Sequence, residues 1–206
     1  MAMEAGADAL GFIFVEGTPR FIEPPAAAKI ISWLPPFVTP VGVFWDHAEG
    51  LVKAIAEECR LGALQFHGDE SPEALADHRL PVIKTIKLPP VSMIEGMLEY
   101  RVGQRFAALQ YFKVAAAVLL DTDMRWSEGE AREPIEWRQA ATIAAVYRDK
   151  PRPKVILSGG LTPDNVAQAI GIVKPYAVDV NSGVEASPGI KDPDKVRRFV
   201  AAVRST

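Results

Sequence analysis

The chain has 206 residues, a formal net charge of −3 at pH 7, 49% hydrophobic residues and 24% charged residues. This length and composition suffice for one domain with a sizeable core, spanning residues 1–206. Acidic and basic residues are interspersed, which argues against a nucleic-acid-binding surface and against electrostatic attachment to a membrane. We therefore expect the partner to be a small molecule.

Cysteine and apolar content narrow the class further. Cys59 is the sole cysteine, so no internal disulfide forms, and no Cys/His group has the spacing of a metal site. The apolar runs are shorter than the roughly 20 residues that span a bilayer, and the first residues show no signal-peptide pattern. These features predict a soluble, cytoplasmic protein without a metal.

Seven short apolar runs alternate with helix-like stretches. They are Ala9–Val15, Val41–Phe44, Ala63–Phe66, Val82–Ile86, Ala117–Leu120, Val155–Leu157 and Ala177–Val180. The runs are almost continuously apolar, which is typical of parallel strands covered by helices on their outer face. The pattern predicts one parallel sheet and the α/β class.

Helix starts are marked by a short polar residue followed by proline, as at Ser71-Pro72, Thr162-Pro163 and Asp192-Pro193. The polar side chain caps free backbone N–H groups, and proline fits the first helical position. After the last of these starts, apolar residues from Val196 to Val203 recur at helical spacing. Cys59 ends a similar stripe, so we interpret it as a packing residue rather than a nucleophile.

The first residues predict the end of a helix. Met1–Ala5 is followed by Gly6, a residue typical of a helix C-terminus, and the first apolar run begins at Ala9. A βα repeat that opens with the end of its helix shows no strand of its own. Seven visible strands and one absent strand make eight, and eight parallel strands alternating with helices close into a TIM-type barrel. We therefore expect a (β/α)8 TIM-type barrel with strand 1 and most of helix 1 absent from this chain.

In such barrels the functional residues follow the carboxyl ends of the strands. Gly159 and Gly160 follow one apolar run, and Ser182 and Gly183 follow the next. Glycines at these positions let backbone N–H groups approach an anion. The pair of loops predicts a phosphate site, and the alternative is that both are tight turns selected for geometry alone.

Three further polar residues stand at strand ends. Asp121 follows an apolar run, where partial burial would raise its pKa and suit it to donate a proton. Arg20 is suited to bind a carboxylate bidentately, and His67 is suited to donate to a ligand. The alternatives are a carboxylate that accepts backbone hydrogen bonds, a surface arginine and a structural histidine.

Taken together, the motifs resemble the phosphoribosylanthranilate isomerase family along nearly the whole chain. The matching segments are Gly6–Phe14, Thr18–Ile22, Val41–Phe44, Leu64–Gly68, Leu119–Thr122, Leu157–Leu161, Val178–Glu185 and Pro188–Asp192. The Gln-Phe-His-Gly segment, followed later in the chain by Asp-Val-Asn-Ser-Gly-Val-Glu, is the most specific part of the match.

The resemblance implies an Amadori rearrangement of N-(5-phosphoribosyl)anthranilate in tryptophan biosynthesis, without a metal or organic cofactor. It implies that Asp121 is the general acid that opens the ribose ring and that Arg20 binds the anthranilate carboxylate. The two glycine-containing loops match the phosphate site. We expect His67 and Asp179 to contact substrate, and the role of Asp179 stays open.

Two departures from the family pattern accompany the resemblance. The implied base is a cysteine in a Lys-Ile-Cys-Gly motif at the end of the first strand, which this sequence does not contain. The segment Met124–Trp137 differs from the family's glycine-rich turn, with only Gly129 and Trp137 matching. Low activity of this chain is therefore expected.

The rival functions are another phosphate-binding barrel enzyme, such as an indole-glycerol-phosphate synthase or a sugar-phosphate epimerase, and a catalytically impaired paralogue or fragment that binds a phosphorylated ligand. The first requires a catalytic lysine at a strand end or a set of metal ligands. Lys84 is the one obvious strand lysine.

Overall fold

The computed structural model describes residues 1–93, 108–122, 133–148 and 150–206. Seven strands form one parallel sheet, in which neighbours in the chain are neighbours in space. They are β1 (Ala9–Ile13), β2 (Thr39–Phe44), β3 (Ala63–Phe66), β4 (Val82–Leu88), β5 (Ala117–Thr122), β6 (Lys154–Leu157) and β7 (Ala177–Val178). The seven predicted parallel strands and the α/β class are confirmed.

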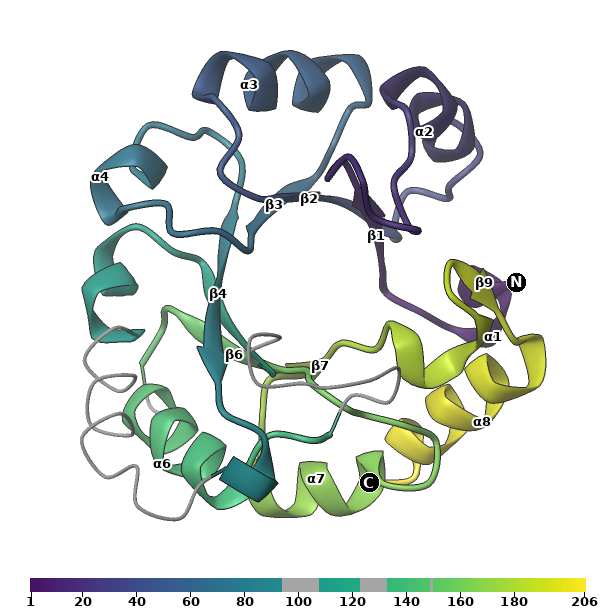
Figure 1. Cartoon of the computed structure of the whole chain (residues 1–206), viewed down its shortest axis with the longest axis vertical. Helices are drawn as coiled ribbons and strands as arrows, with labels where there is room; N and C mark the ends of the chain where they lie inside the picture. Colours follow the sequence, from purple (N-terminus) through teal and green to yellow (C-terminus); the bar gives the residue numbers. More distant parts are fainter. Residues whose placement is uncertain (94–107, 123–132, 149) are drawn as a thin grey trace.

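Figure 1 shows the sheet curled on itself, with the helices arranged around its outer face. The α-helices are α1 (Ala2–Ala5), α2 (Pro24–Ile31), α3 (Glu49–Glu58), α4 (Pro72–Leu75), α6 (Trp137–Tyr147), α7 (Val166–Val173) and α8 (Pro193–Arg204). Short 3₁₀ turns occur at η1 (Val91–Met93), η2 (Tyr111–Lys113) and η4 (Ser182–Val184), and β8 (Glu185–Ser187) pairs antiparallel with β9 (Ile190–Lys191). Sequence patterns did not predict this hairpin.

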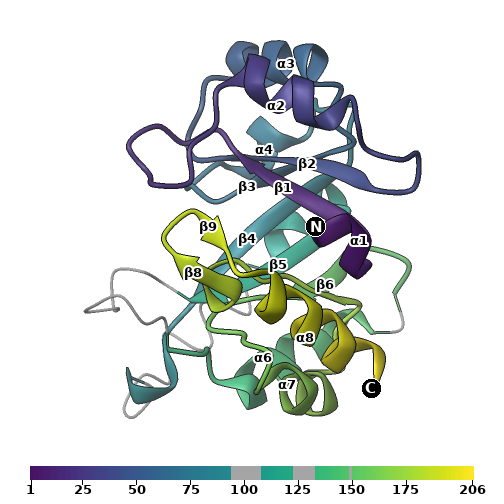
Figure 2. The same cartoon turned by 90° about the vertical axis from the view of Figure 1, so that its right-hand side faces the viewer.

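The two end strands of the sheet are β1 and β7, and no strand pairing joins them in the described ranges. Figure 2 shows α1 beside α8 on this side of the molecule. Arg204 Nη2 donates to the carbonyl of Gly6 at 3.3 Å. The predicted helix end is confirmed, because Gly6 follows α1 with a left-handed φ of 102°. That this chain lacks one strand of the barrel stays a prediction.

Two of the three predicted helix starts are confirmed. The Ser71 side chain accepts from the N–H of Ala74 at the start of α4, and Asp192 accepts from the first N–H groups of α8. The start at Thr162-Pro163 was placed too early, because this dipeptide begins a turn and α7 starts at Val166. Asn165 Oδ1 accepts from the N–H of Thr162 and closes that turn.

Two hydrophobic clusters lie between the sheet and the helices. The first surrounds Phe44, Leu64 and Phe66 beneath α2, α3 and α4, and the second surrounds Leu120 and Leu157 beneath α6, α7 and α8. Cys59 belongs to the first cluster and is 1% exposed, as predicted for a packing residue. The core is therefore divided between two halves of the barrel, each built on its own strands.

Some predictions fall on residues outside the described ranges. They concern most of the segment Met124–Trp137, of which Trp137 starts α6. In the described part of the chain, no helix is long and apolar enough to cross a membrane. The same residues contain no group of three or more His, Cys, Asp or Glu side chains arranged to hold a metal ion.

Candidate active site

Polar side chains form a layer at the carboxyl ends of β4 to β7. Lys87 pairs in register with Asp121, and the register of β5 with β6 brings Ser158 next to Asp121. Ser158 Oγ in turn donates to Asp179 Oδ2 at 3.1 Å. Residues in register on parallel strands direct their side chains to the same face of the sheet. This layer therefore joins both predicted carboxylates, Asp121 and Asp179.

Asp121 is 8% exposed at the end of β5. Its Oδ1 accepts from the N–H of Thr122 at 2.8 Å, and Thr122 Oγ1 donates to the carbonyl of Glu133 at 3.0 Å. The second bond ties the end of β5 to the segment before α6. The structure thus shows both the burial expected of a proton donor and the local backbone hydrogen bond expected of a structural carboxylate.

The loops after β6 and β7 converge. Gly159, Gly160, Ser182 and Gly183 line one recess together with Asp179. Gly159 and Gly160 have left-handed φ values of 77° and 64°, which glycine adopts without strain. A Cβ on Gly183 would lie 1.8 Å from the carbonyl oxygen of Leu161, so only glycine fits there. The structure places the two predicted loops at the same end of the sheet.

Arg20 lies on the loop after β1 and forms a bidentate ion pair with Glu185 in β8. The Arg20 Nε and Nη2 atoms lie 2.8 and 2.5 Å from the two carboxylate oxygens. Lys191 Nζ donates to Glu185 Oε1 at 3.0 Å and to the carbonyl of Asn181 at 2.7 Å. Burial raises the pKa of Glu185, but hydrogen bonds and charges from Arg20 and Lys191 outweigh it and bring the pKa to about 2. Glu185 is therefore a fixed anion.

Arg20, Glu185 and Lys191 line a cavity of about 180 Å³ together with residues of β1. Asn181 lines both this cavity and the phosphate recess, so the two adjoin. Asp121 is not among the described residues that line the Arg20 cavity, and that both side chains face one mouth of the barrel stays a prediction. Asp121 belongs instead to the polar layer at the ends of β4 to β7.

His67 follows β3 and is half-buried. Gln65 alternates along β3 with Leu64 and Phe66, which pack beneath the helices, so it faces the inside of the sheet. Its Nε2 atom lies 2.6 Å from His67 Nε2. Lys87 Nζ lies 4.1 Å from the centre of the Trp45 ring, where the two side chains form a cation–π contact. His67, Trp45 and Lys87 therefore stand at the ends of three consecutive strands.

Sequence patterns assigned no role to four of these residues. Glu185 and Lys191 lie within matched motifs. Glu185 is 165 residues from its partner Arg20 in the chain, and Lys191 binds Glu185. Lys87 lies just beyond the predicted strand Val82–Ile86, whereas β4 continues to Leu88. Trp45 follows β2 directly. It is 44% exposed, unlike the aromatic residues of the core.

The chain resembles proteins of one family. The family model described as N-(5'phosphoribosyl)anthranilate (PRA) isomerase matches residues 1–202. An N-(5'-phosphoribosyl)anthranilate isomerase from Geobacter sp. (strain M21) is 47% identical over 204 residues, which cover 99% of this chain and 91% of the relative.

Solved structures agree with this match. The phosphoribosyl anthranilate isomerase from Thermotoga maritima superposes with a TM-score of 0.82 at 35% identity, covering 100% of this chain and 92% of its own. A phosphoribosyl anthranilate isomerase in complex with reduced 1-(o-carboxyphenylamino)-1-deoxyribulose 5-phosphate gives a TM-score of 0.80 at 35% identity, with coverages of 100% and 91%. The expected TIM-type architecture is confirmed by these neighbours.

Proposed function

The chain belongs to the N-(5'-phosphoribosyl)anthranilate isomerase family, and from this premise we propose how its described residues serve the reaction. The protein is an isomerase of tryptophan biosynthesis that carries out the Amadori rearrangement of N-(5'-phosphoribosyl)anthranilate. The comparisons do not favour the rival phosphate-binding barrel enzymes. Lys84, which such a rival would use as a catalytic lysine, is 2% exposed beside residues that face the outer helices.

The substrate phosphate binds in the recess formed by the loops after β6 and β7. Support comes from the convergence of Gly159, Gly160, Ser182 and Gly183, since left-handed glycines leave backbone N–H groups open to an anion. A related structure holds a phosphorylated ligand, the reduced carboxyphenylamino-deoxyribulose phosphate. The partner of this chain is accordingly a phosphorylated small molecule rather than a nucleic acid, and the reaction proceeds in the cytoplasm.

Asp121 is the general acid. Its carboxyl group delivers a proton to the ribose ring oxygen, the bond from that oxygen to C1 breaks, and the anthranilate nitrogen supplies the electrons that form the iminium ion. A base then removes the proton at C2, and the resulting enolamine becomes the ketone product. Support comes from the burial of Asp121 in the same polar layer as Asp179, which lines the phosphate recess.

Arg20 binds the anthranilate carboxylate. Its pair with Glu185 uses Nε and Nη2, so two Nη1 N–H groups remain for a second carboxylate. The Arg20 cavity adjoins the phosphate recess at Asn181. A substrate with a phosphate at one end and a carboxylate at the other would therefore span the two sites, with His67 and Asp179 contacting its sugar.

Cys59 does not serve as the base. It is buried on the helix side of the sheet, its Sγ contacts the carbonyl of Pro24 at 3.3 Å, and burial raises the pKa of its thiol. The cysteine that the family uses is thus a different one. The reaction needs no metal or organic cofactor, because its steps are proton transfers that a general acid and a general base carry out.

The convergence of the two glycine loops beside the Asp179 and Asp121 layer is the observation that carries this function. It is tested by measuring conversion of N-(5'-phosphoribosyl)anthranilate by the chain, together with binding of the reduced product analogue. Binding and a low turnover are expected, because the sequence contains no Lys-Ile-Cys-Gly motif to supply the base, and both should fall further when Asp179 is replaced by alanine. A chain that binds the analogue but never turns over substrate would favour the impaired paralogue, and absence of both would refute the proposal.

A further inference from the structure

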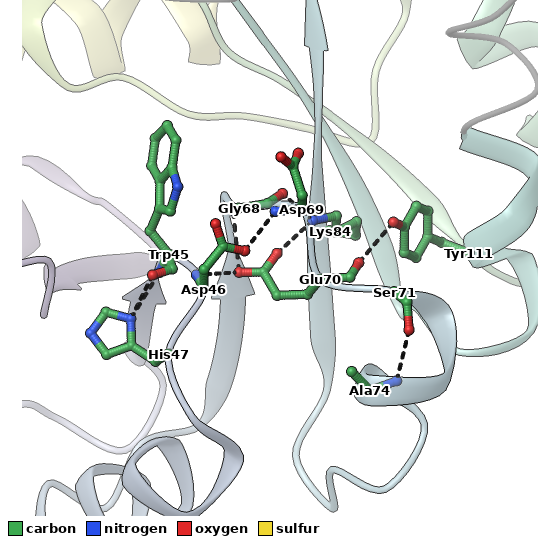
Figure 3. Close-up of polar contacts among 10 residues, drawn as sticks. All are labelled: Trp45, Asp46, His47, Gly68, Asp69, Glu70, Ser71, Ala74, Lys84 and Tyr111. Carbon is green, nitrogen blue, oxygen red and sulfur yellow. Dashed lines mark hydrogen bonds and ion pairs between the residues drawn. The ribbon is translucent and has the colours of Figure 1, made fainter.

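One carboxylate joins the ends of two strands on the side of the barrel opposite the phosphate recess. Glu70 Oε1 accepts from the backbone N–H of Asp46, just after β2, at 2.9 Å, and from that of Gly68, just after β3, at 3.2 Å. Figure 3 shows this carboxylate between the two loops. A single side chain therefore fixes the position of one loop relative to the other.

Lys84 balances the charge of Glu70. Its Nζ lies 2.6 Å from Glu70 Oε2 and 2.7 Å from the carbonyl of Gly68. The two side chains are only 3% and 8% exposed. Removing one partner of such a pair leaves a buried charge without compensation, which is strongly unfavourable. The position of the carboxylate therefore depends on the lysine.

Lys84 reaches this pair from the outer face of the sheet. Its neighbours at alternate positions, Val82 and Ile86, belong to the clusters beneath the helices, so Lys84 points away from the barrel interior. Tyr111 covers the pair, with its hydroxyl donating to the carbonyl of Glu70 at 2.8 Å and its ring centre 5.5 Å from Lys84 Nζ. The pair is thus separated from any substrate in the barrel mouth.

The loops have little freedom around this pair. Asp46 Oδ1 accepts from the N–H of Asp69 at 2.7 Å, which links the two loops a second time. A Cβ on Gly68 would lie 2.1 Å from that same oxygen. The backbone of the two loops is therefore closely packed, and its geometry is set by two hydrogen bonds to Glu70 and one to Asp46.

Each loop carries a side chain of the barrel mouth immediately before the bonded residue. Trp45 precedes Asp46, and His67 precedes Gly68. Trp45 contacts Lys87 and His67 contacts Gln65, both on the inner side of the sheet. In Figure 3 the Trp45 ring points away from the His47 ring of the same loop. A shift of either backbone N–H group would displace one of these two side chains.

We propose that Lys84 and Glu70 are positioning residues for the active site: their buried ion pair fixes the loops after β2 and β3 and so holds Trp45 and His67 in place for substrate. This inference rests on the proposed function, because it assigns the barrel mouth to substrate. Lys84 contacts no reacting atom and acts through the loops.

The test uses the full chain with Lys84→Met, with the double variant Lys84→Met/Glu70→Gln, and with Leu75→Ala as the matched control. Methionine removes the charge and leaves the Glu70 carboxylate unpaired. The double variant removes both charges, while the amide oxygen introduced at position 70 still accepts from the two N–H groups. Leu75 is 2% exposed in α4, so its truncation destabilises the same half of the barrel while both charges of the pair stay in place.

Binding of the reduced product analogue and of inorganic phosphate is measured at a temperature at which all variants are folded. Lys84→Met is expected to weaken analogue binding by about tenfold or more, as small displacements of positioning groups do. It should leave phosphate binding within about twofold, since the phosphate loops follow β6 and β7. The double variant should recover much of the affinity, and the control should bind both ligands normally.

Equal loss of both ligands in Lys84→Met, or the same loss in Leu75→Ala, would overturn the proposal in favour of a purely structural pair. Amide hydrogen exchange provides a second test, which needs no substrate. Protection of residues 45–48 and 67–70 should fall in Lys84→Met and return in the double variant. Unchanged protection would overturn the positioning role, whereas a wild-type chain that binds no analogue would overturn the proposed function alone.

Discussion

The phosphate recess and the Arg20 cavity lie side by side but are built from different materials. The recess is formed by backbone, with Gly159, Gly160 and Gly183 in conformations or spaces that exclude a side chain. The cavity is formed by charged side chains, with Arg20 held by Glu185. The comparison teaches that the glycine backbone of the recess is fixed by sterics, whereas the Arg20 cavity is fixed by charges that depend on pH.

The largest effect is expected at Asp121, which belongs to neither site. Asp121→Asn should lower kcat by about 10² to 10⁴-fold, because the proton is needed only as the ring opens. Binding of the reduced product analogue should stay within a few-fold of the wild type. Steady-state kinetics and calorimetric titration measure the two quantities, and unchanged turnover would show that another residue is the acid.

A smaller effect is expected for the backbone site. Gly183→Ala places a Cβ 1.8 Å from the Leu161 carbonyl oxygen, so the loops must move apart at a cost of roughly 2–4 kcal/mol. Affinity for inorganic phosphate should fall by about 10²-fold at any pH from 5 to 8. Gly17→Ala is the control for a left-handed glycine in open space, and it should keep phosphate binding.

The charged site is expected to respond to acid. The folded-state pKa of Glu185, about 2, lies below its ordinary value of 4.5. Its ion pairs therefore contribute stability above pH 4.5, and that contribution disappears as the pH falls towards 2. It amounts to on the order of 2–3 kcal/mol, since water screens part of the interaction. Urea unfolding across this window should show a steeper pH dependence of stability for the wild type than for Glu185→Gln; parallel curves would contradict the assignment.

Removal of Arg20 is expected to have the next effect. Arg20→Ala should weaken analogue binding by about 30-fold, or roughly 2 kcal/mol, because a charged bidentate contact is lost. Affinity for inorganic phosphate should stay close to that of the wild type, because Arg20 does not line the phosphate recess. Competition titrations measure the affinities for phosphate and for the analogue. An equal loss of both affinities would show that Arg20 serves the phosphate site as well.

The smallest effect is expected at Cys59. Cys59→Ala should cost about 1 kcal/mol of unfolding free energy, since it removes one buried sulfur and its contact with the Pro24 carbonyl. Turnover should be unchanged at a temperature where both proteins are folded. A loss of rate beyond the loss of folded protein would place Cys59 in the reaction after all.

The strands were predictable because each is a short, almost unbroken apolar run between helix signals. The predicted strand ended at Ile86, whereas β4 continues to Leu88; functional residues of such barrels stand at these carboxyl ends of the strands. The β8–β9 hairpin was missed because its strands have only three and two residues. Such strands are too short for a period-two pattern.

The site was predictable where its residues are close in sequence and unpredictable where they are distant. The glycine loops follow their strands directly, so their position was readable from the chain. Glu185 meets Arg20 across 165 residues, and Glu70 meets Lys84 from a loop whose path no local pattern defines. Such long-range ion pairs depend on how the sheet curls, and the identities of the individual residues do not reveal that.

Lys191 touches both neighbouring sites at once. Its Nζ donates to the carbonyl and side chain of Asn181 in the phosphate recess and to Glu185 beside Arg20. An anion that orders Asn181 therefore also orders Glu185, the partner of Arg20. In the same way, a carboxylate bound to Arg20 orders Glu185 and, through Lys191, Asn181. Phosphate and anthranilate offered as separate molecules should consequently help each other to bind, by an equal factor in each direction. Covalent substrate, which carries both groups, would gain this mutual reinforcement in a single binding event.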